Sequence, residues 1–137
     1  MFLISSTIHY NVKVDEILEF FRDVIDKTLA DLPKELKENI QNLEFIILDY
    51  PTQTFLEEHK FTTQTLLGLY VGVPLNKRGA NYSLVLPDRI YIFMQPIIYF
   101  ANLEKIPLEE KIRKVVLHEI GHYFGMGEDD LRNLGIY

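Results

Sequence analysis

The sequence contains no cysteine, and its charged residues include more acids than bases. Without cysteine there are no disulfides, thiolate metal sites or cysteine nucleophiles, so any metal must be held by His, Asp or Glu. Fourteen Lys and Arg residues against twenty Asp and Glu residues give a net charge of −6. Nucleic-acid binders normally present a basic face, and anionic membranes attract polybasic segments. We therefore expect neither a nucleic-acid nor a membrane partner.

Long apolar runs are also missing. No stretch approaches the roughly 20 apolar residues of a membrane span. The N-terminal segment "MFLISSTIHYNVKVDE" is apolar at first but lacks the basic region and cleavage site of a signal peptide. We expect it to be part of the fold, and the protein to be cytoplasmic. The 137 residues, 47% hydrophobic and 25% charged, predict one soluble domain spanning residues 1–137.

Hydrophobic periodicity and prolines predict the helices. Apolar residues recur at helical spacing from Asp15 to Ala30. Pro33 and Pro96 suit the first turns of two shorter helices, and Pro107 that of a last long helix reaching about Phe124.

Three apolar segments predict strands, namely "LEFIILDY" (43–50), "LLGLYVGV" (66–73) and "RIYIFM" (89–94). The polar segment "PTQTFLEEHKFTTQT" (51–65) is expected to be a loop. The strands cluster rather than alternate with helices, which favours an α+β fold.

The segment "VVLHEIGHYFGMGEDD" (115–130) has the residues of a metal site. His118 and His122 are four apart, so on a helix they project about 40° apart and can reach one ion. Zinc accepts imidazole nitrogens and needs about four ligands. Glu119 points beside such an ion, where a carboxylate can take a proton from metal-bound water. "HEIGH" thus predicts two zinc ligands and one general base.

A third ligand is expected after Gly125, which suits a left-handed residue that ends the helix and reverses the chain. Glu128 is the preferred candidate, with Asp129 and Asp130 as alternatives. With three protein ligands, water would fill the fourth position of a catalytic site. All three acids have another interpretation, because they would also suit the start of a final short helix.

The pattern HExxHxxGxxE at residues 118–128 resembles the metzincin zinc-binding motif, with Glu128 in place of the third histidine. The methionine turn of metzincins lies further downstream, and no equivalent follows here. A closer resemblance is to the bacterial family of minimal zincin-like metallopeptidases. The segments "LLGLYVGVPL", "LPDRIYIF" and "VVLHEIGHYFGMGEDDLRNLG" resemble that family in the same order.

The resemblance implies a compact zincin-like α+β fold, with a small sheet packed against the HExxH helix. It implies His118, His122 and Glu128 as zinc ligands, and Glu119 as general base. The expected function is zinc-dependent hydrolysis of a peptide or protein substrate, and we expect this substrate to bind along an exposed strand edge. The alternatives are a non-catalytic metal-binding or peptide-binding module on the same scaffold, and a motif that binds no metal.

Overall fold

A four-stranded mixed sheet forms the centre of the computed structural model, which describes residues 3–6, 12–60, 66–78 and 87–133. The strand order is β1 (Leu3–Ser6), β2 (Leu43–Leu48), β4 (Asp88–Phe93) and β3 (Gly68–Val71). β1, β2 and β4 run parallel, whereas β3 pairs antiparallel with β4. Within the described part of the chain, β3 is therefore an edge strand.

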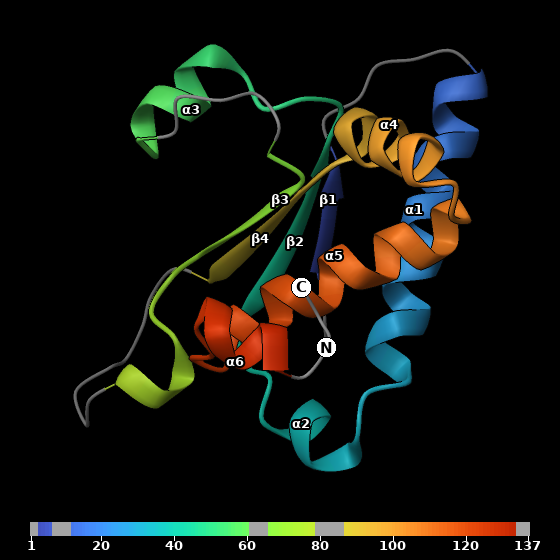
Figure 1. Ribbon diagram of the computed structural model, residues 1–137. Helices are drawn as coiled ribbons and strands as arrows, with labels where there is room; N and C mark the ends of the chain where they lie inside the picture. The colour runs from blue at the N-terminus through green and yellow to red at the C-terminus, as the bar shows by residue number, and fades with distance from the viewer. Residues whose placement is uncertain (1–2, 7–11, 61–65, 79–86, 134–137) are drawn as a thin grey trace.

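The helices lie mainly along one face and one end of this sheet (Figure 1). They are α1 (Val12–Ala30), α2 (Lys34–Glu38), α3 (Gln53–Glu58), α4 (Met94–Glu104), α5 (Leu108–Tyr123) and α6 (Glu128–Asn133), with one 3₁₀ turn at Leu75–Lys77. α5 packs against α1 and α4 and also contacts β3 and β4. The HExxH helix is thus held on three sides by the rest of the fold.

The core follows from alternation along the two central strands. Leu43, Phe45 and Ile47 of β2 are buried, whereas the residues between them are only partly buried. The buried side chains face the apolar stripes of the helices, which include Phe21, Ile25 and Leu29 of α1 and Ile112, Val116 and Ile120 of α5. Burial of these side chains is the main favourable term in folding, and it fixes α5 against the sheet.

The predicted α+β fold class, with a small sheet packed against the HExxH helix, is confirmed. The predicted helices and strands are present, with ends shifted by one to three residues. The prediction of a loop over residues 51–65 is wrong for Gln53–Glu58, which forms α3, and its last part, residues 61–65, lies outside the described residues. Thr52 caps this helix by accepting a hydrogen bond from the Phe55 N–H, and Leu56 is buried beneath it. Six residues are too few to show helical periodicity.

The short strand β1 was also not predicted as a strand. β1 pairs in parallel with β2, so α1 and α2 form the connection between these two neighbouring strands. None of the helices in the described ranges is both long and apolar enough to cross a membrane.

Candidate metal centre

The last two turns of α5 bring the two motif histidines together. His118 and His122 lie one turn apart, and their Nε2 atoms are 3.2 Å from each other. Both side chains are partly buried, at 21% and 26% exposure. The His122 Nδ1 lies 2.9 Å from the Met126 carbonyl oxygen. A carbonyl oxygen only accepts, so Nδ1 carries the proton and Nε2 has its lone pair available.

The end of α5 is formed by a Schellman turn, as the sequence predicted for Gly125. Gly125 has φ +92°, and its N–H donates to the His122 carbonyl oxygen. The Met126 N–H donates to the Gly121 carbonyl oxygen. This pair of bonds reverses the chain after the helix and also aims the Met126 carbonyl oxygen at His122.

The reversed chain places Glu128 at the two histidines. Its Oε1 lies 3.0 Å from the His122 Nε2 and 3.4 Å from the His118 Nε2. Glu128 is also the first residue of α6, so the alternative interpretation, an acid at the start of a final short helix, describes this residue as well. Asp130 accepts from the Gly127 N–H, and Asp129 pairs with Arg132. Of the three acids, only Glu128 joins the two histidines in a cluster with metal-ligand spacing.

The donor set of this cluster fits zinc. Two nitrogen lone pairs and a carboxylate oxygen converge, and a cation relieves the repulsion among such electron-rich atoms. Ligand atoms about 2.0–2.1 Å from a tetrahedral zinc ion lie about 3.3 Å apart. The observed separations of 3.2, 3.0 and 3.4 Å are close to this value.

Glu119, the predicted general base, lies beside this cluster in a buried position. It is 6% exposed, and its Oε1 accepts a hydrogen bond of 2.8 Å from the Tyr70 N–H on β3. Burial raises the pKa of Glu119 above its ordinary value, against the lowering effects of His118 and His122. The edge strand thus holds one carboxylate oxygen, while the second remains available at the site.

Gly68 allows β3 to approach α5 this closely. A Cβ atom at this position would lie 2.9 Å from Val115 Cγ1 and 3.3 Å from Glu119 Cγ. No role was predicted for this glycine from the sequence. Its contact partner lies on a helix more than forty residues away in sequence, so only the fold explains the requirement.

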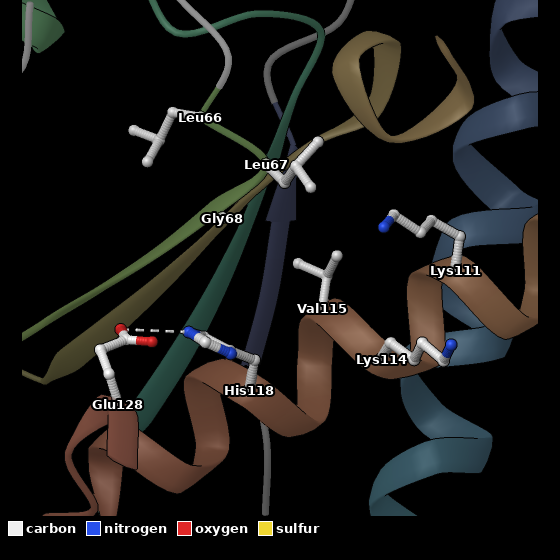
Figure 2. A pocket seen from close by; sticks show the side chains of 8 residues that line it. All are labelled: Leu66, Leu67, Gly68, Lys111, Lys114, Val115, His118 and Glu128. Atoms are coloured by element: carbon white, nitrogen blue, oxygen red, sulfur yellow. Dashed lines mark ion pairs between the residues drawn. The ribbon is translucent and has the colours of Figure 1, made fainter. Parts of the chain in front are cut away.

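Two cavities meet at the cluster. One, of about 590 Å³, extends along Tyr70 and Gly72 and is bordered by Met126 on the other side. The other, of about 400 Å³, lies over the preceding turns of α5 and is closed by Leu66 and Leu67 (Figure 2). His118, Glu128 and Gly68 line both cavities. The site is therefore open on both sides of the cluster, along the edge of β3.

A second polar cluster lies behind β3 and was not found from the sequence. The buried Asp88 carboxylate accepts from the Tyr70 hydroxyl and from the Arg78 guanidinium, each at 2.5 Å. The same guanidinium lies 5.4 Å from the centre of the Tyr123 ring on α5. Burial and Asp88 raise the pKa of Tyr70 far above its ordinary value, so this hydroxyl stays a donor. Through Tyr70, this cluster is connected to Glu119.

Comparison with known proteins agrees with this geometry. No curated protein matches the sequence closely enough to count as a relative. A family model described as zincin-like metallopeptidase matches residues 40–136, which include both cavities and the whole His–His–Glu cluster. The chain belongs to the zincin-like metallopeptidase family.

Proposed function

We propose that this protein is a zinc-dependent peptidase. His118, His122 and Glu128 would hold the ion through the two Nε2 atoms and a carboxylate oxygen. The observation that carries the proposal is the convergence of these three acceptor atoms beside a buried carboxylate, in a site open to two cavities. When bound, zinc would supply Lewis-acid polarisation of the scissile carbonyl and would acidify water.

The protein's own residues would carry the proton transfers. Glu119 would accept the proton of the attacking water and deliver it to the leaving amine. The Tyr70 N–H would fix the orientation of this carboxylate by binding Oε1, which leaves Oε2 for the proton. Because Glu119 is buried, water competes little for the same oxygen atoms.

The edge of β3 that pairs with no strand of the described ranges would bind the substrate backbone. The Phe93 N–H donates to the Leu67 carbonyl oxygen, so Leu67 turns its backbone groups toward β4. Bonding alternates along an antiparallel pair, and the backbone groups of Gly68 therefore face away from β4. A peptide added along this edge would pass directly over the His–His–Glu cluster.

The test is Glu119→Gln, with Glu110→Gln as the matched control. Glu110 is an exposed residue near the other end of the same helix. In Glu119→Gln we expect zinc to stay near one ion per chain while kcat/KM for a cleaved peptide falls by roughly 10²–10⁴-fold. The control should match the parent protein in both measurements. Elemental analysis and a quenched-fluorescent peptide library provide the two readouts.

Unchanged turnover in Glu119→Gln would show that Glu119 is not the general base. A zinc-loaded parent protein that binds peptides and cleaves none would instead identify a non-catalytic peptide-binding module. A protein purified with no zinc, and unable to take it up, would contradict both functions.

A further inference from the structure

The 400 Å³ cavity beside His118 combines apolar walls with basic side chains. Leu66, Leu67 and Val115 form the apolar part. Lys111 and Lys114 line the end away from Glu128 (Figure 2). For a protein with a net charge of −6, two lysines beside the candidate catalytic site are a local reversal of charge.

Helix geometry puts both lysines within reach of a bound peptide. Lys114 lies one turn before His118 and Lys111 two turns before it, or about 6 and 10 Å along the axis. Lys111 shares the helix face of Val115 and His118, and Figure 2 shows its amine reaching toward Leu67 over the cavity. Its side chain is 13% exposed, so this charge is partly shielded from water.

The ion pairs leave net positive charge at this end of the cavity. The Lys111 Nζ is 2.9 and 3.0 Å from the two carboxylate oxygens of Glu104 at the end of α4. Lys114 forms no ion pair with any residue in the described ranges. At this end of the cavity, Lys111, Lys114 and Glu104 leave one net positive charge, carried by the exposed Lys114 and available to a ligand carboxylate. Glu128 lies at the other end, beside the histidines.

We propose that this cavity selects a peptide carboxylate on the C-terminal side of the scissile bond. The inference rests on the proposed peptidase function and names its substrate class. Antiparallel pairing is the more stable arrangement, and a peptide antiparallel to β3 would run from the Val71 end toward the Leu66 end. The residues that follow the scissile bond then enter the cavity that Lys111 and Lys114 line.

Two sources can supply such a carboxylate. One is an acidic side chain just after the scissile bond, whose methylene groups would contact Leu67 and Val115. The other is the free C-terminus of a substrate cut close to its end. Both would bring one negative charge to the same lysines, and the peptides of the experiment distinguish them.

The experiment uses alanine-rich quenched-fluorescent hexapeptides and the zinc-loaded full chain. The residue after the scissile bond is Glu, Gln, Leu or Lys, and each peptide is made with a free and with an amidated C-terminus. We expect kcat/KM for Glu to exceed that for Gln by roughly 3- to 10-fold, as for an interaction between partly exposed charges. A preference for the free over the amidated terminus, with no Glu preference, would identify the second source.

Three variants assign this preference to the cavity. Lys114→Glu should abolish or invert the carboxylate preference, measured as the ratio of kcat/KM for the Glu peptide to kcat/KM for the Gln peptide within the same variant. Glu104→Gln should increase the preference, because it releases Lys111 from its ion pair. Lys34→Glu on α2 makes the same charge change outside both cavities and should leave the preference unchanged. A preference that is absent, or unaffected by Lys114→Glu and Glu104→Gln, would overturn the inference and leave the peptidase intact.

Binding separates this failure from a failure of the proposed function. The affinities of the same peptides are measured on zinc-loaded Glu119→Gln, which requires no turnover. Tighter binding of the carboxylate peptide, lost in the double variant with Lys114→Glu, would support the inference even if no peptide is cleaved. Equal affinities for all the peptides would contradict it in either case.

Discussion

The two polar clusters of this protein differ in how their hydrogen-bonding groups are balanced. In the candidate metal centre, the two Nε2 atoms of His118 and His122 face the carboxylate of Glu128. All of these are acceptor atoms when both histidines are neutral and protonated on Nδ1. In the cluster behind β3, donors from Arg78 and Tyr70 meet the carboxylate of Asp88.

This balance of donors and acceptors distinguishes a ligand-binding site from a structural ion pair. With both histidines in that form, the three converging atoms have no donor among them, so we expect the candidate metal centre to take up a cation from outside the chain. The Asp88 cluster has its own counter-charge and donors, so it is satisfied by the chain alone. Zinc should therefore raise the stability of the protein through the first cluster. Mutations in the second cluster should cause the larger losses of stability when no zinc is present.

The largest effect is expected from Asp88→Ala. This change leaves the nearly buried Arg78 charge without its counter-ion and the Tyr70 hydroxyl without its acceptor. Breaking such a pair should lower the free energy of unfolding by about 3–5 kcal/mol. Urea unfolding measured with a chelator present provides the test. Glu44→Ala, which breaks the more exposed pair with Arg89, is the control and should cost less than about 1 kcal/mol.

His122→Ala should reduce the stabilisation by zinc and leave the stability without zinc unchanged. The parent protein should gain about 2.7 kcal/mol of stability when free zinc is 100 times its dissociation constant. The variant should lose this gain and retain the stability measured with chelator. Thermal unfolding at a series of zinc concentrations checks both points. His59→Ala, at the C-terminal cap of α3, should keep the full zinc response. An equal response in His122→Ala would exclude His122 as a ligand.

Gly125→Ala tests the turn that joins the two halves of the metal centre. Alanine at φ +92° is strained, and its Cβ would lie against the Asn76 side chain. We expect a loss of about 1–2 kcal/mol in unfolding free energy. Zinc affinity should fall as well, because the turn positions both the Met126 carbonyl oxygen and Glu128. Gly127→Ala, where a Cβ would have space, should change neither quantity substantially.

The same contrast explains what the sequence could predict. The grouping of His118, His122 and Glu128 follows from local geometry, since eleven residues contain a helical repeat, a glycine turn and the returning acid. Asp88, Arg78 and Tyr70 are brought together by the antiparallel pairing of β3 with β4, in which Tyr70 lies opposite Ile90. No spacing rule connects residues whose proximity depends on strand register.

The order of the strands in the sheet could not be predicted from the sequence for a related reason. The apolar segments of β2, β3 and β4 were recognisable, but their order in the sheet is decided by which neighbours bury the most surface. β4 lies between β2 and β3, and this arrangement leaves β3 at the edge beside α5. The edge position that places the buried Gly68 next to the candidate metal centre is therefore a property of the tertiary fold.

Tyr70→Phe should give the smallest and most specific effect. It removes the hydroxyl that donates to Asp88 but keeps the backbone N–H that binds Glu119. Because the Arg78 bond to Asp88 remains, we expect a loss of about 1 kcal/mol in unfolding free energy. The zinc response should match that of the parent protein, since no acceptor of the metal centre is changed. A large loss of zinc affinity in Tyr70→Phe would mean that the two clusters are energetically coupled through β3. The balance of donors and acceptors could then not be considered for each cluster on its own.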